Sequence, residues 1–155
     1  MEETDEIAEL IEQLYAMDHI ITAMQKHPHE YDGVSLHANE AHTLKMIARS
    51  EGISQADLSE QMFRTKGATS VMVDKLVEKG LVRRERVEDD QRRYLLALTP
   101  RGLAVHRAHL ARDAQQVALF TQQVGLTKEE LEVTIRTMDR IIAFYSHNYI
   151  RHGAQ

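Results

Sequence analysis

The sequence has no cysteine, only two prolines, few aromatic residues and no long apolar run. Without cysteine there is no disulfide framework, thiolate metal site or cysteine nucleophile. No apolar run reaches the roughly 18 to 20 residues of a membrane span, and the acidic start MEETDEIAEL is unlike a secretory signal. We therefore expect the 155 residues to form one cytoplasmic, mostly helical domain without membrane attachment.

Positive charge is concentrated in the middle of an otherwise acidic chain. Residues 64–101 hold ten Lys and Arg against six Asp and Glu, a net charge of +4. Since the whole chain carries −5, the rest carries −9. A localised basic segment predicts a face that binds a polyanion, although a solvated charged surface is the alternative.

Apolar side chains at helical spacing predict long amphipathic helices at both ends of the chain. These helices span residues 2–26, about 100–123, and a last segment that opens at the capping box formed by Thr127 and Glu130. Their apolar stripes are too long for a small core to cover, so we expect them to pair with a second subunit in a homodimer.

The middle of the chain predicts a helix-turn-helix followed by a β-hairpin. Helices are expected over 39–49, 55–61 and 66–79, and extended segments over 83–87 and 94–98 flank an acidic turn. The helix over 66–79 is expected to bury Val71, either Val73 or Met72, Leu76 and Val77. This order is that of a winged helix-turn-helix. The predicted fold class is mainly α with a small β-hairpin wing and long N- and C-terminal dimerisation helices. The expected domains are an N-terminal dimerisation helix and loop (1–34), the winged helix-turn-helix (35–101) and C-terminal dimerisation helices (102–155).

The start of the helix at 66–79 and the tip of the wing are the expected DNA contacts. The first turn of this helix would face the major groove, and the wing arginines would enter the minor groove, where negative potential is enhanced. The alternative for Arg92 is a salt bridge with Asp90 that fixes the hairpin. The candidate DNA-binding residues are Arg64, Thr65, Lys66, Thr69, Ser70, Lys75, Arg92 and Arg93.

These residues resemble the MarR family of transcriptional regulators. The resemblance is carried by residues 55–59 (QADLS), by 73–82 (VDKLVEKGLV), and by the wing motif Asp90-x-Arg92 followed by LALTPRG at 96–102. It implies an obligate dimer of triangular outline that binds a pseudo-palindromic operator, usually as a repressor relieved by a ligand. A remote alternative is a winged-helix module that binds proteins and not DNA. The sequence has no Gly-rich phosphate loop, serine elbow or H-E-x-x-H, so we expect no enzymatic activity.

Nine histidines raise the question of a metal effector, although no cofactor is certain. His106, His109 and Asp113 share one face of one predicted helix, and imidazole with carboxylate suits Zn²⁺ or Mn²⁺. The layout is similar to that of the zinc-sensing members of the family, and this implies a metal set of His42, His109, Asp113 and Glu30. Asp113 stands where those members have a second histidine. A structural, hydrogen-bonded pair of His42 and His109 is the alternative.

The sequence is also similar to the repressors of fatty-acid synthesis, at residues 39–43 and 102–109. That similarity implies an acyl chain in an apolar tunnel between the dimer helices and the winged domain. Ordinary core packing is the alternative for each lining residue, so the effector stays open between a metal, an acyl chain, another organic anion and none. The candidate lining residues are Met17, Ile21, Met24, Leu44, Leu103 and His106.

Overall fold

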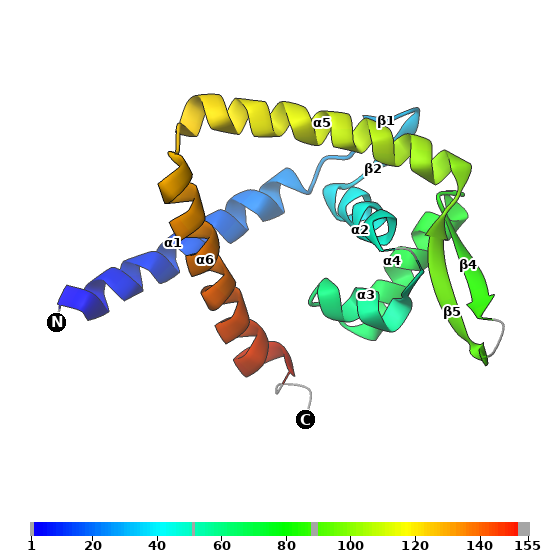
Figure 1. Ribbon diagram of the computed structural model, residues 1–155, viewed down its shortest axis with the longest axis horizontal. Helices are drawn as coiled ribbons and strands as arrows, with labels where there is room; N and C mark the ends of the chain where they lie inside the picture. Colours follow the sequence, from blue (N-terminus) through cyan, green and yellow to red (C-terminus); the bar gives the residue numbers. More distant parts are fainter. Residues whose placement is uncertain (1, 51, 88–89, 152–155) are drawn as a thin grey trace.

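The computed structural model describes residues 2–50, 52–87 and 90–151, and it is mainly helical with a small β wing (Figure 1). The predicted helices are all present, with ends within about two residues of those expected. The elements in order are α1 (Glu2–Met24), β1 (His29–Tyr31), β2 (Val34–Leu36), α2 (Ala38–Arg49), β3 (Ile53–Ser54), α3 (Gln55–Gln61), α4 (Lys66–Glu78), β4 (Val82–Val87), β5 (Asp90–Leu98), α5 (Pro100–Val124), α6 (Lys128–Tyr145) and a π-helical turn, η1 (Ser146–Arg151).

Side-chain caps start the helices of the winged domain where the sequence predicts them. The Ser54 hydroxyl accepts a hydrogen bond from the Asp57 N–H at 3.1 Å, and the Thr65 hydroxyl accepts one from the Ala68 N–H at 3.1 Å. Each cap satisfies a backbone donor that the first helical turn leaves without a partner. The caps therefore fix α3 and α4 as two separate helices joined by a short turn, which is the helix-turn-helix.

The wing is an antiparallel pair, β4 and β5, in register from Val82 opposite Leu98 to Arg86 opposite Tyr94. The two-residue strand β3 pairs with β5 on its other side and completes a three-stranded sheet in the order β3-β5-β4. The wing joins α5 at Gly102, where a Cβ atom would lie 1.9 Å from the Leu81 carbonyl oxygen. Only glycine permits this close approach, which sets where α5 leaves the wing.

A second hairpin, β1–β2, lies where only a loop is expected between the N-terminal helix and the winged domain. Its strands are three residues each, too short for an alternating pattern to be recognised. The turn between them has positive φ at both Asp32 (50°) and Gly33 (74°), which suits a tight hairpin. The hairpin packs on α5 and brings Tyr31 into the core.

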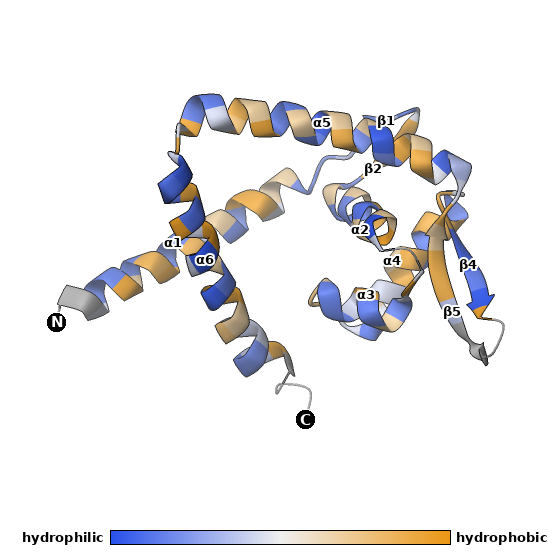
Figure 2. Cartoon of the chain, in the orientation of Figure 1, coloured by the Kyte–Doolittle hydropathy of each residue, from blue (hydrophilic) through white to orange (hydrophobic). Residues whose placement is uncertain are grey.

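The core of the described residues excludes the two terminal helices. Every buried apolar core residue lies between Tyr31 and Val105, in the β1–β2 hairpin, the winged domain or the start of α5. Figure 1 shows α1 and α6 crossing each other away from that core, and Figure 2 shows apolar stretches along both helices. Large apolar side chains on α1, distal α5 and α6 are therefore exposed, among them Ile7, Met17, Ile21, Phe120, Ile135 and Phe144. None of the described helices is long and apolar enough to cross a membrane.

Candidate nucleic-acid interface

The start of α4 is an exposed, capped helix end with a basic side chain. Thr65 and Lys66 are both exposed, as the sequence predicts for residues that reach DNA. Gly67 and Ala68 follow as small exposed residues, so the backbone of this turn is open to a ligand. A helix N-terminus with small residues can approach a phosphate closely, because its N–H groups and the helix dipole favour negative charge.

Along α4 the outward face continues through Val71 and Lys75, and Val71 corrects the sequence analysis. Val71 is 57% exposed and not buried, because the buried stripe runs instead through Thr69, Val73 and Leu76. An exposed valine on such a helix offers an apolar contact for a thymine methyl group. Val71 lies four residues after Gly67 and therefore on the same face of the helix, and this spacing could have shown from the sequence that Val71 is exposed.

Two candidate DNA-binding residues of the sequence analysis point inward. Thr69 is 1% exposed, and its hydroxyl donates to the Thr65 carbonyl at 3.0 Å. Arg64 is partly buried and donates through Nη1 to the Thr43 hydroxyl of α2 at 3.3 Å. Through these bonds both side chains stabilise the turn before α4. A third candidate, Ser70, is only partly exposed.

The wing contributes basic side chains from β4. Arg86 lies 5.6 Å from the centroid of the Tyr94 ring, and Arg84 pairs with Asp74 of α4, which ties the wing to the helix. Both arginines belong to the basic segment 64–101, and their run along a hairpin strand is the signal that could have placed them at the site. Arg92 and Arg93 lie in β5, but their side chains are outside the described part of the structure.

Three histidines, a lysine and an aspartate lie together where α2 meets α5. The Lys45 ammonium pairs with Asp113, whose other carboxylate oxygen is 3.4 Å from His109 Nε2. His109 is 8% exposed, and its ring packs edge-on against Tyr31 with centroids 5.4 Å apart. The Nδ1 atoms of His106 and His109 are buried without a hydrogen-bond partner.

The predicted metal set does not come together as a metal site. Asp113 is already paired with Lys45, and Glu30 is exposed on β1. Over residues 2–50, 52–87 and 90–151, no group of three or more His, Asp or Glu side chains is arranged to hold a metal ion. His42 and His109 therefore lie in a cluster that also contains the positively charged Lys45, and this charge disfavours the binding of a divalent cation beside it.

This cluster predicts that the fold loses stability in mild acid. Burial lowers the pKa of His42, His106 and His109, and the positive charge of Lys45 lowers each further, while Asp113 opposes the shift. The folded state therefore prefers neutral imidazoles, and the unfolded chain takes up protons below about pH 6.5. The stabilisation is complete above that pH and is lost as the pH falls below it.

Urea unfolding at pH 7.5 and pH 5.5 checks this expectation. The wild-type free energy of unfolding should be lower at pH 5.5, and the double variant His106→Gln, His109→Gln should show a smaller difference between the two pH values. His27→Gln, which changes an exposed histidine, serves as the control. Equal stability of the wild type at both pH values would show that these histidines are not held neutral.

The predicted ligand-lining residues are divided between different environments. Leu44 is fully buried in the core, His106 is partly buried, and Leu103 is exposed on α5. Met17, Ile21 and Met24 are exposed on α1. A hollow of about 570 Å³ lies between α1 and α6, and Phe63 is among the residues that line it. Its lining is apolar apart from residues such as Asp18, and none of the six predicted residues contributes to it.

The known proteins and the family that match this chain are all transcriptional regulators. A sequence model of the MarR family matches residues 33–93. The chain is 38% identical over 89 residues to a putative transcriptional regulatory protein for the hcr operon of Thauera aromatica, covering 57% of this chain and 51% of that protein. It is 30% identical over 108 residues to an uncharacterised HTH-type transcriptional regulator, YhjH, of Bacillus subtilis, covering 66% of this chain and 62% of that one. The chain thus spans between half and two thirds of the length of these relatives.

The fold has a solved counterpart over nearly its whole length. A mutant of Escherichia coli MarR complexed with operator DNA superposes with a TM-score of 0.72, at 22% identity, over 89% of this chain and 96% of that one. At this identity the likeness concerns the fold, and it includes the terminal helices as well as the winged domain. The family match spans the β1–β2 turn through the wing, the segment that carries the exposed start of α4. Residues 33–93 of the chain are therefore similar to the MarR family, and the fold is similar to that of the MarR structure.

Proposed function

We propose that this protein is a homodimeric, sequence-specific DNA-binding transcription regulator without enzymatic activity. It acts as a ligand-responsive repressor on a pseudo-palindromic operator. In this proposal residues 35–101 bind DNA, and residues 1–34 and 102–155 form the dimer. Two copies related by a twofold axis would present two α4 helices to two half-sites of one operator.

One observation carries the proposal: α4, whose start is capped and exposed, is tied to a basic wing by the ion pair of Asp74 and Arg84. The tie matters because a helix in the major groove and a wing along the backbone must keep a fixed spacing. Phosphate contacts from Lys66, Lys75 and the wing arginines supply affinity, and outward side chains such as Val71 supply base contacts.

The dimer is supported by the apolar faces of the terminal helices. Leu131, Ile135 and Met138 on α6 are 40%, 58% and 37% exposed, although they form one stripe of a helix. Exposed apolar patches of this extent on α1, α5 and α6 are typical of an interaction surface. A second copy provides matching helices with the same pattern, and the pairing would bury both sets.

The effector would act at the junction of the dimer helices and the winged domain. The hollow between α1 and α6 touches Phe63, which immediately precedes the turn into α4. An apolar molecule such as an acyl chain fits this lining better than a metal ion does. Occupation of the hollow would change how the dimer helices and the start of α4 sit relative to each other, and so release the operator.

Selection of duplexes from a random-sequence pool tests the function. The wild-type protein should enrich one pseudo-palindromic sequence, and Lys66→Ala should bind that duplex and random duplex more weakly by a similar factor. We expect its salt slope to be smaller by about 1 per substituted phosphate contact. Lys128→Ala removes an equal charge from α6, where Lys128 is 83% exposed, and should bind as the wild type does. Enrichment of no sequence by the wild type would contradict the proposal.

A further inference from the structure

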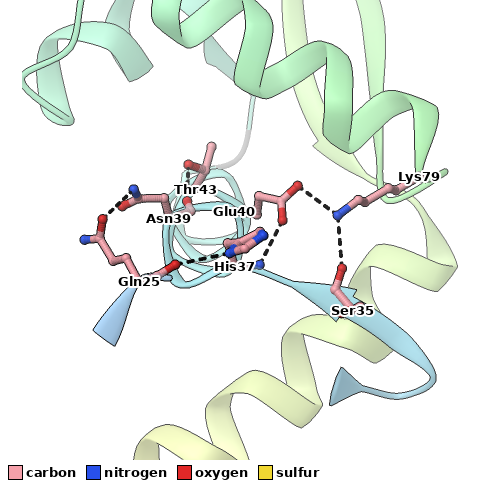
Figure 3. Close-up of polar contacts among 7 residues, drawn as sticks. All are labelled: Gln25, Ser35, His37, Asn39, Glu40, Thr43 and Lys79. Atoms are coloured by element: carbon pink, nitrogen blue, oxygen red, sulfur yellow. Dashed lines mark hydrogen bonds and ion pairs between the residues drawn. The ribbon is translucent and has the colours of Figure 1, made fainter. Parts of the chain in front are cut away.

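A chain of hydrogen bonds joins the end of α1 to the end of α4 (Figure 3). Gln25, just after α1, accepts a bond from Asn39 at 2.9 Å through its side chain, and its carbonyl lies 3.1 Å from His37 Nδ1. Glu40 of α2 accepts a bond from the His37 N–H at 2.8 Å with one carboxylate oxygen. Its other oxygen accepts a bond from Lys79 Nζ, also at 2.8 Å.

Lys79 is the C-cap residue of α4, so this chain of bonds ends on the helix proposed to enter DNA. Its ammonium also donates to the Ser35 carbonyl of β2 at 3.0 Å, and Figure 3 shows it between Ser35 and Glu40. A single side chain thus holds the end of α4 against both β2 and α2. The DNA-facing end of the same helix, at Thr65, is 14 residues away.

Because the two ends of α4 are far apart, a small change of angle at Lys79 displaces the start of the helix by a larger distance. At a rise of 1.5 Å per residue the two ends are about 20 Å apart, so a tilt of roughly 5° at Lys79 would displace the start of α4 by about 2 Å. Hydrogen bonds to base edges tolerate only a few tenths of an ångström. Sequence recognition therefore depends on this attachment more strongly than non-specific attraction to phosphates does.

The charged carboxylate of Glu40 is costly to bury, although the Lys79 side chain is 34% exposed, and this cost indicates that the pair is kept for its geometry. Glu40 is 5% exposed, and burial by itself would raise the pKa of its carboxyl group. The bonds from Lys79 and from the His37 N–H lower that pKa below its usual value instead, so the carboxylate stays charged. A buried ion pair often adds little net stability compared with an apolar pair, whereas it fixes one relative placement of its two elements.

We propose that Glu40 and Lys79 are positioning residues that set the angle of α4 from the α1–α2 junction and so link the dimer helices to operator recognition. This inference rests on the proposed function. It adds a route by which a shift of α1, through Gln25 and the start of α2, reaches the recognition helix. Neither residue needs to touch DNA in this role.

The test compares specific with non-specific binding. Wild type, Glu40→Gln, and the double variant Glu40→Gln, Lys79→Met are titrated by fluorescence anisotropy with the duplex that the wild type selects and with a random-sequence duplex. Glu40→Gln keeps an oxygen that accepts the hydrogen bond from the His37 N–H. The double variant leaves no buried charge without a partner. We therefore expect at least one of the two variants to fold. Circular dichroism and a thermal melt check that each variant is folded. The matched control is Glu132→Gln, Lys128→Met, which removes an exposed pair on α6 whose charged atoms are 3.8 Å apart.

We expect each variant at the pair to lose about tenfold in affinity for the selected duplex, with unchanged affinity and salt slope on random duplex. The double variant should lose at least as much as Glu40→Gln alone, because it also removes the bond from Lys79 to the Ser35 carbonyl. Equal losses on both duplexes, with a salt slope reduced by about 1, would make Lys79 a phosphate contact and overturn the proposal. Affinities equal to those of the control pair would overturn it as well. Failure of the wild type to select any duplex would instead overturn the proposed function.

Discussion

Changing Leu131, Ile135 and Met138 together to glutamine is expected to abolish the dimer and to lower affinity for the selected duplex by at least about a thousandfold. A monomer meets one half-site only, and its binding should fall towards the non-specific level. Because α6 contributes no buried residue to the core, the winged domain should stay folded in this variant. Analytical ultracentrifugation measures the oligomeric state, and anisotropy measures the affinity.

The control for this variant changes Glu132, Arg136 and Asp139 to glutamine. These side chains are exposed at the same spacing on an adjacent face of α6. This control should remain dimeric and should keep its affinity. A triple Leu131, Ile135 and Met138 variant that stays dimeric with wild-type affinity would place the interface elsewhere.

Capping chemistry explains why the helices could be predicted so closely. Ser54, Thr65, Thr99 and Thr127 each accept a hydrogen bond from the backbone three residues on, as expected from the side chains alone. Such caps are local, so a single sequence contains the information. Strand β3 could not be predicted, because its partner β5 is distant in the chain. The β1–β2 hairpin is local, but its three-residue strands are too short for an alternating pattern to be recognised.

The exposure of the candidate DNA-binding residues could be predicted for some side chains and not for others. Lys66 and Thr65 are exposed as expected, since a capped helix start after a short turn faces outward. Thr69 lies four residues before Val73 and seven before Leu76, so the helical period alone places it on the buried stripe. Arg64 could not be assigned from sequence, because its partner Thr43 is on another helix.

In the histidine cluster, the helical spacing of potential metal ligands suggests a metal site that the packing of the two helices does not support. His109 and Asp113 are four residues apart on α5 and do approach each other, as the helical period predicts. Lys45 of α2, which shares Asp113, can be found only from the packing of α2 on α5. The same spacing that indicates a metal site therefore also occurs in a charge-balanced contact between two helices.

Ionic strength should change DNA affinity by the largest factor of all. Two copies of the α4–wing surface together would make roughly 6 to 10 phosphate contacts, and each contact releases condensed counterions from the duplex. The sources of charge in each copy include Lys66, Lys75 and Arg86, all exposed. A winged-helix module that binds another protein would lack this steep dependence.

The most direct test of DNA binding is therefore the affinity of the wild-type protein for its selected duplex, measured between 50 and 200 mM salt. We predict that affinity falls by about 10³ to 10⁵ over this range, linearly on logarithmic axes. An affinity that stays nearly constant would contradict DNA binding by α4 and the wing.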